Sequence, residues 1–188
     1  MARLIISLAC VAGLLSTSTA EAKRCGGVEM ADSVTVGEQQ LVLNGMGIRE
    51  ATVFNVDVYV AGLYVPTASN DANTLLANDV PKRLVLHFVR EVDRSDMEEA
   101  FQNGFGSAAE AQARNIERLT GMMPDEIGEG DIITFTYLPD SGLQVQVGRR
   151  TRGTIRGAAF ARTFFRIWLG SSPPNRGLKR GLLGGECG

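Results

Sequence analysis

The cysteines are the first residues whose spacing suggests chemistry. Cys10 lies in an apolar segment at the start of the chain, whereas Cys25 and Cys187 lie near the two ends of the remainder. Two cysteines in an oxidising compartment suggest one bridge, and chain termini often lie close together. Closing this loop would remove on the order of 5 kcal/mol of unfolded-state entropy. We therefore expect a Cys25–Cys187 disulfide, and the alternative is two unpaired thiols in frayed tails.

The N-terminal segment indicates the compartment. Arg3 precedes an apolar stretch over residues 4–15, a Ser/Thr run follows, and the small-x-small tripeptide of residues 20–22 ends the segment. These are the three parts of a secretory signal peptide, so we expect residues 1–22 to be cleaved. A membrane anchor would need roughly 18 to 20 apolar residues, more than this segment offers. The mature chain, residues 23–188, is expected to be periplasmic or secreted and to have no transmembrane segment.

Most catalytic motifs are missing from the sequence. The single histidine, His87, lies in an alternating strand-like segment and is interpreted as a strand-surface residue. The sequence has no Cys-x-x-Cys, Gly-x-Ser-x-Gly or phosphate-loop pattern. We therefore expect no metal site and no cofactor.

The densest positive charge is at Arg149, Arg150, Arg152 and Arg156. Such a cluster could bind an anion or an acidic lipid head group. The alternative, which we favour, is an exposed edge strand whose charges prevent sheet-to-sheet pairing.

Composition excludes several classes of protein. The 188 residues carry 19 Lys and Arg against 21 Asp and Glu, a net charge of −2, and 44% are hydrophobic. The apolar fraction is too high for a disordered chain, and the balanced charge gives no general attraction to nucleic acid. We expect one globular domain over residues 23–188 and no nucleic-acid partner.

Hydrophobic patterning predicts the elements that position these residues. Strands are expected at 34–36, 41–43, 53–60, 63–65, 83–90, 132–138 and 143–148, with a chain break at 44–47. In the strand at 53–60, Phe54, Val56, Val58 and Val60 share one face and Tyr59 lies on the other. Helices are expected at 71–79, 95–105, 107–119 and 158–169; Ser-x-x-Glu capping boxes open the second and third. After Gly170 we expect a loop, with at most one helical turn at 179–183. This order predicts an α+β fold with a mainly antiparallel sheet.

Four motifs together resemble a known family. They are Gly-x-Gly-x-Arg at residues 45–49, Val-Tyr-x-x-Gly-Leu-Tyr at 58–64, Pro-Lys-Arg-Leu at 81–84 and Arg-Ile-Trp-Leu-Gly at 166–170. The combination resembles the exported bacterial branch of the chalcone isomerase-like superfamily, over about residues 34–184. The resemblance implies an antiparallel sheet with helices packed on one face and a ligand cleft between them.

The enzymes of that superfamily close a chalcone to a flavanone with an Arg that polarises the carbonyl and with Thr, Tyr and Asn around the cleft. By resemblance, Arg49 and Asn103 match the Arg and the Asn. Tyr59 falls near the position of the Thr, and Asp96 stands where the Tyr should be. Two of the four roles fail, which argues against flavanone chemistry.

The superfamily also includes fatty-acid-binding members, in which an Arg and a Tyr hold the carboxylate. Arg49 and Tyr59 fit that pair, and Met97 and Phe101 could line the chain's tunnel. The resemblance therefore implies an exported, non-catalytic protein that binds a fatty acid or a similar small apolar acid through Arg49, Tyr59 and Asn103. For Arg49 the alternative is a structural ion pair with an acid such as Asp57. An isomerase acting on an enone and a structural or partner-binding envelope protein remain open.

Overall fold

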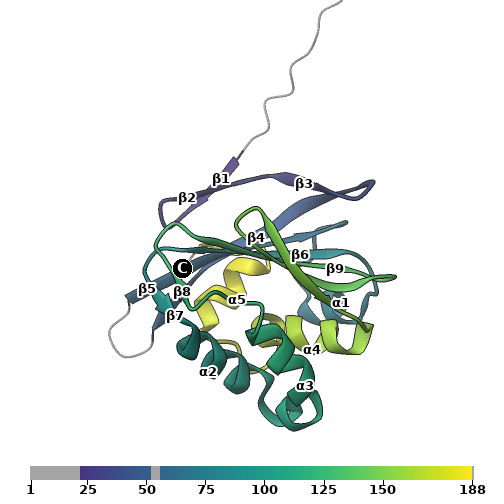
Figure 1. The fold of residues 1–188 in the computed structure, drawn as a ribbon. Coiled ribbons are helices and arrows are strands. Elements are labelled where there is room, and N and C mark those ends of the chain that lie inside the picture. Colours follow the sequence, from purple (N-terminus) through teal and green to yellow (C-terminus); the bar gives the residue numbers. More distant parts are fainter. Residues whose placement is uncertain (1–21, 52–55, 188) are drawn as a thin grey trace, which may run out of the picture.

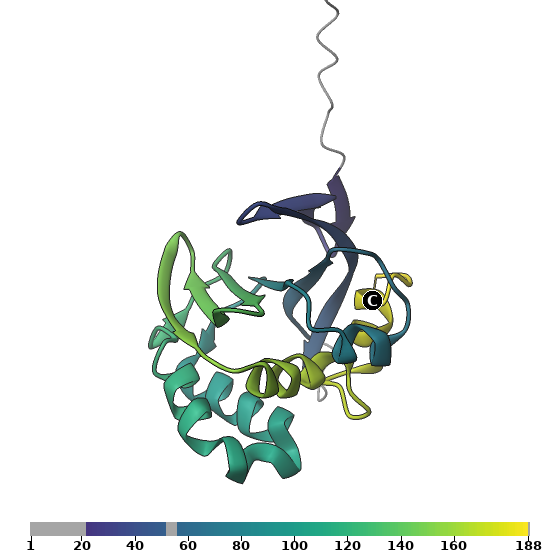
Figure 2. The same ribbon diagram turned by 90° about the vertical axis from the view of Figure 1, so that its right-hand side faces the viewer.

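The computed structural model describes residues 22–51 and 56–187. A seven-stranded antiparallel sheet runs in the order β11-β10-β9-β6-β5-β4-β3 and curls around its concave face (Figures 1 and 2). Its strands are β3 (Ser33–Val36), β4 (Gln39–Ala51), β5 (Val56–Val65), β6 (Lys82–Phe88), β9 (Ile132–Leu138), β10 (Gly142–Val147) and β11 (Arg150–Ile155). Two two-stranded pairs complete the strands, β1 (Ala22–Cys25) with β2 (Val28–Ala31), and β7 (Val92–Asp93) with β8 (Glu126–Ile127).

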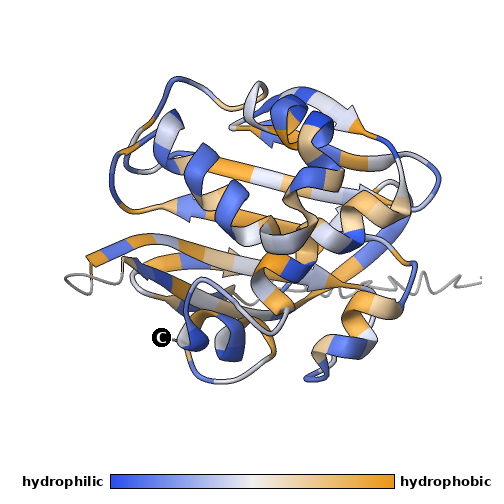
Figure 3. Cartoon of the chain, turned by 90° about the horizontal axis from the view of Figure 1, so that it is seen from below, coloured by the Kyte–Doolittle hydropathy of each residue, from blue (hydrophilic) through white to orange (hydrophobic). Residues whose placement is uncertain are grey.

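The helices gather on one side of the sheet (Figure 3). They are α1 (Ala72–Ala77), α2 (Arg94–Phe105), α3 (Ala109–Thr120), α4 (Ala158–Leu169) and α5 (Arg176–Leu182), with a short 3-10 turn at Gly106–Ala108. On β6 the alternation is complete, since Leu84, Leu86 and Phe88 are buried toward the helices. The α+β fold with helices on one face of an antiparallel sheet is confirmed. Within the described parts of the chain, no helix is long and apolar enough to cross a membrane.

A second, smaller core lies on the other face, under the hairpin of β1 and β2. Cys25, Val28 and Met30 pack there against Val60 and Tyr64 of β5. The predicted disulfide joins this hairpin to the C-terminal tail, because Cys25 and Cys187 are bonded with their Cα atoms 5.7 Å apart. The predicted signal peptide lies outside the described residues, except for Ala22.

The predicted break at residues 44–47 is wrong, because β4 continues through it. The two glycines allow helix α5 to pack backbone against backbone on the strand. A Cβ on Gly45 would lie 2.0 Å from the carbonyl oxygen of Gly181, and one on Gly47 would lie 2.5 Å from that of Leu178. The glycines therefore mark a close approach of helix and strand.

Helix α5 corrects the prediction that the tail is a loop with at most one turn. It spans seven residues, and its own side chains Leu178 and Leu182 are buried. Tertiary packing supports this helix, since so short a segment has little stability of its own.

The predicted capping boxes do not form. Helix α2 begins one residue before Ser95, with Asp93 as N-cap, and α3 begins at Ala109 with Ala108 as N-cap. Neither N-cap side chain makes a capping hydrogen bond. The extended N-cap of α2 is Asp93, so Ser95 already lies inside the helix. The 3-10 turn leads directly into α3, and its N-cap Ala108 is helical, not in the extended conformation that a Ser cap requires.

Candidate functional site

A cleft of about 460 Å³ lies between β4–β6 and helices α2 and α4. Its volume is within the range of small-molecule sites, roughly 300 to 1,000 Å³. The lining is mostly apolar, with polar side chains gathered at a few places: Arg49, Ala51, Val58, Tyr59, Leu86, Arg90, Glu91, Val92, Asp96, Met97, Ala100, Phe101, Asn103, Gly104, Ile167, Trp168, Ser172, Pro173 and Pro174.

Arg49 and Tyr59 are direct cross-strand partners, near the end of β4 and the start of β5. Opposite residues of an antiparallel pair project to the same face, so both side chains lie on the helix side and both line the cleft. The structure thus brings together the two residues that the sequence singled out.

A β-bulge lies next to this pair at the polar end of the cleft. The register passes from Arg49–Tyr59 directly to Glu50–Asp57, which leaves Val58 without a partner on β4. Val58 and Tyr59 therefore both line the cleft, although strict alternation predicted opposite faces. Val60, which was predicted to share the face of Val58, packs under the N-terminal hairpin instead.

Tyr59 is held by the indole of Trp168. The Trp168 Nε1–H donates to Tyr59 Oη at 3.0 Å, in buried surroundings. Burial raises the pKa of Tyr59 to about 12, although the bond from Trp168 and the charge of Arg49 both lower it. The phenol therefore stays protonated near neutral pH, and since its oxygen already accepts a bond, its own hydrogen is the group left to donate.

Arg49 presents a polar atom that no described residue satisfies. Its Nη1 is buried and makes no hydrogen bond with any described residue. The alternative partner, Asp57, is exposed and lies opposite Glu50 in the register, and no ion pair joins it to Arg49 within the described residues. A buried donor without a partner is costly, so this atom is open to a group other than the described residues.

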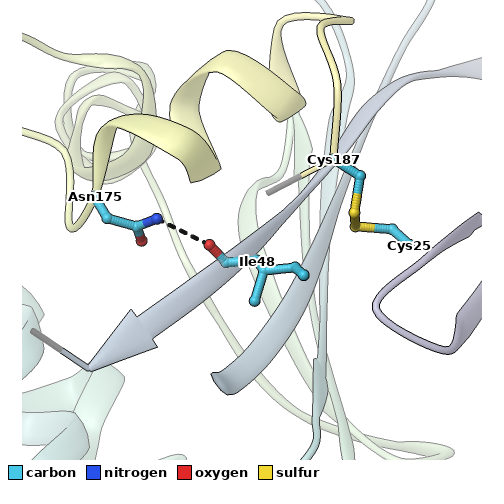
Figure 4. The surroundings of a disulfide bond; sticks show 4 residues. All are labelled: Cys25, Ile48, Asn175 and Cys187. Atoms are coloured by element: carbon cyan, nitrogen blue, oxygen red, sulfur yellow. Dashed lines mark hydrogen bonds between the residues drawn. A yellow bond between two sulfur atoms is a disulfide. The ribbon is translucent and has the colours of Figure 1, made fainter. Parts of the chain in front are cut away.

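The strand that carries Arg49 is fixed by the segment before α5. Asn175 is the N-cap of α5, but its Nδ2 donates to the carbonyl oxygen of Ile48 at 3.0 Å (Figure 4). The three residues before it, Ser172 to Pro174, form one wall of the cleft. The C-terminal segment thus closes the cleft and ties down the backbone next to Arg49.

Comparison with known proteins identifies the family of the chain. The sequence profile of the chalcone isomerase-like family matches residues 22–184. The chain belongs to the chalcone isomerase-like family. Among solved structures, a fatty-acid binding protein from Arabidopsis thaliana matches with a TM-score of 0.70, over 87% of this chain and 96% of that chain, at 18% identity. At that identity the likeness shows a shared fold. None of the curated proteins compared with it matches the sequence.

Helix α2 supplies the opposite wall of the cleft in this chalcone isomerase-like chain. Met97 and Phe101 are buried and line it, as the resemblance implied. Asn103 and Asp96 also line it but are exposed, so they lie at its rim. Asn103 makes no hydrogen bond to Arg49 or Tyr59 among the described contacts.

Two other sequence candidates lie away from the cleft. His87 is half-buried on β6, on the face opposite the helices, between Val60 and Ile132 in the register. Arg150 and Arg152 are exposed on β11, which is an edge strand of the sheet, and Arg149 and Arg156 are exposed directly before and after it. The expected position on an edge strand is confirmed, and the role of these charges in preventing sheet-to-sheet pairing stays a prediction.

Sequence reasoning missed the roles of Trp168 and Asn175. Trp168 was predicted only as part of an apolar helix stripe, and Asn175 falls in a segment interpreted as loop. Trp168 lies 109 residues from its partner Tyr59, and Asn175 lies 127 from Ile48. The one signal was chemical, because a buried Trp N–H usually finds an acceptor.

Proposed function

We propose that this protein binds a fatty acid or a similar small apolar acid in the cleft between the sheet and helices α2 and α4. The carboxylate would lie against Arg49 and Tyr59, and the chain would lie along the apolar wall that includes Met97 and Phe101. The observation that carries the proposal is the buried, unpartnered Nη1 of Arg49 at the polar end of an apolar cleft.

The chemistry of the pair suits a carboxylate. A guanidinium binds a carboxylate through two parallel N–H bonds, and a buried charge is stabilised when an opposite charge joins it. The Tyr59 hydroxyl adds a neutral donor, because its oxygen already accepts from Trp168. The apolar wall then favours a ligand whose remaining part is hydrocarbon.

A binding role is better supported than an isomerase role. The pKa of Tyr59, about 12, makes the phenol a donor rather than a base. Asp96 stands where the resemblance implies a second hydroxyl, and it lies exposed at the rim. The fatty-acid binding protein that shares this fold supports the same choice.

We also propose that the protein works outside the cytoplasm, in the periplasm or after secretion, once residues 1–22 have been removed. The Cys25–Cys187 disulfide supports an oxidising compartment. N-terminal sequencing of exported protein should begin at Lys23, and a sequence that begins at Met1 would contradict the proposal.

The test of the binding proposal uses protein purified without added lipid. Its organic extract should contain a fatty acid or similar acid by mass spectrometry, and Arg49→Ala purified in parallel should contain far less. If the wild-type protein carries no such acid and takes none up on incubation with free fatty acids, the proposal is wrong.

A further inference from the structure

Positive charge is concentrated in the last third of the chain. Between Asp140 and Glu186 the sequence contains nine Lys and Arg residues and no Asp or Glu, although the whole chain has a net charge of −2. Four of the nine are the arginines of the β11 edge, and Arg162 lies on α4. The other four are Arg166, in the last turn of α4, and Arg176, Lys179 and Arg180 of α5.

Three of these four cations line an open depression. Lys179 Nζ donates to the carbonyl oxygen of Gly170 at 2.7 Å, and Arg166 packs against the same glycine. Arg176, Lys179 and Arg180 line a depression of about 630 Å³, which we call the basic hollow. Because these three residues follow helical i, i+3, i+4 spacing, they share one face of α5. Leu178 and Leu182 are buried beneath that helix, and α5 beside the C-terminus is mostly hydrophilic in Figure 3.

Among the described residues that line the hollow, none is acidic. Asp71 follows the lining residue Asn70, but its carboxylate caps α1 through Asn73 N and Thr74 Oγ1. Glu186 is a second acidic residue close in sequence to the lining, since it follows Gly185.

The basic hollow adjoins the ligand cleft. Pro173 lines both, so only the loop before α5 separates them. Helix α5 is also firmly placed, by its backbone contact with β4 and by the disulfide that follows it. The hollow is therefore a fixed positive surface beside the mouth of an apolar cleft.

We propose that the basic hollow docks on the surface of an anionic phospholipid membrane, with the cleft mouth beside the lipid. Cations spread over one helix face suit a surface of many head groups, each charge adding to the attraction. Leu183, which also lines the hollow, offers apolar contact between the cations. The β11 edge carries as much charge but lies at the far side of the sheet from α5 and β4, away from the cleft. The proposal goes beyond acid binding and does not depend on it.

The test is co-sedimentation of the full chain with vesicles at low salt. Phosphatidylcholine vesicles with and without phosphatidylglycerol are compared for the wild type and for two matched double variants. Arg176→Gln/Arg180→Gln should weaken binding to anionic vesicles roughly 30-fold, since each cation near such a surface contributes about a fivefold gain. Arg150→Gln/Arg152→Gln, with the same charge change on β11, should change binding little. Any contribution from residues 1–21 is common to all variants.

Three results would overturn the proposal. They are equal binding to neutral and anionic vesicles, an equal loss in the β11 variant, and displacement of the protein from vesicles by inorganic phosphate beyond that caused by chloride at matched ionic strength. The last would indicate a small-anion site instead. Melting temperature and fatty-acid affinity of both variants report folding. If the hollow variant does not fold, Arg176→Gln alone replaces it, with about a fivefold loss expected.

Discussion

The indole Nε1 of Trp168 donates a 3.0 Å hydrogen bond to the hydroxyl of Tyr59, and so joins helix α4 to the strand opposite Arg49. Tyr59 also packs edge-on against Phe88, with ring centroids 5.5 Å apart. The ring position and the direction of the hydroxyl hydrogen are thus fixed before any ligand arrives. Such preorganisation reduces the entropy that binding must overcome.

Replacing Tyr59 by Phe should weaken fatty-acid binding about 2- to 10-fold, because one neutral donor is lost. It should also lower the free energy of unfolding by about 1–3 kcal/mol, because the buried Trp168 N–H loses its acceptor. Calorimetric titration with a soluble fatty acid and urea unfolding measure the two effects. Tyr64→Phe is the matched control, since that hydroxyl donates to the Ala31 carbonyl away from the cleft. Equal losses of affinity in both variants would count against the site.

The three tyrosines should ionise only at unusually high pH. Burial raises the pKa of Tyr59, Tyr64 and Tyr137 from 10.0 to about 12. Because the folded pKa exceeds the unfolded one, this contribution to stability is complete below pH 10 and is lost as the pH rises toward 12. Phenolate absorbance of the folded protein should therefore stay low at pH 10, where an unfolded control is half ionised. Half ionisation of the folded protein at pH 10 would contradict the packing described.

The close approach of α5 to β4 predicts a sharp effect at Gly47. In Gly47→Ala the added Cβ would meet the Leu178 carbonyl at 2.5 Å, so we expect a loss of about 1–3 kcal/mol in the free energy of unfolding. Gly128→Ala is the control, because its added Cβ would lie in ordinary contact, 3.6 Å from the Asp131 side chain. Urea unfolding of both variants decides the matter, and equal stabilities would show that the helix can move away without cost.

The disulfide should be a major source of stability. It closes a loop with a sequence separation of 162, so Cys25→Ser/Cys187→Ser should lose about 2–5 kcal/mol of unfolding free energy. The wild type should show no free thiol from these two residues when unfolded without reductant. Thiols that titrate there, or a variant as stable as the wild type, would contradict this role.

Sequence patterns correctly predicted those helices and strands whose own hydrophobic pattern is enough to determine their type. The alternation of Leu84, Leu86 and Phe88 identified β6 and its buried face, and the apolar stripe of α4 identified that helix. The disulfide also followed from local facts, because a chain that is expected to be exported and has cysteines near both ends has few other pairings.

The errors fall where distant segments decide local structure. Gly45 and Gly47 are typical of a break, yet they form part of a strand because α5 lies directly on them. Helix α5 itself, with Gly177 and Gly181, has too little propensity to be predicted without that strand. For the candidate site, the resemblance identified Arg49 and Tyr59. Val58 was not predicted to line the cleft, because strict alternation does not allow for the β-bulge that places it there.

The most direct test of the account is the affinity of Arg49 variants for a fatty acid. Losing a charge-assisted hydrogen bond, worth about 1.5 to 3 kcal/mol, should weaken binding by Arg49→Ala about 10- to 100-fold. Arg49→Lys should lie between this variant and the wild type, because it keeps the charge but loses the bidentate fork. Arg83→Ala, which removes a half-buried arginine from the opposite face of the sheet, should bind as the wild type does. If instead Arg49→Ala lowers the melting temperature while its folded fraction binds the acid unchanged, Arg49 is a structural residue and the account of the cleft is wrong.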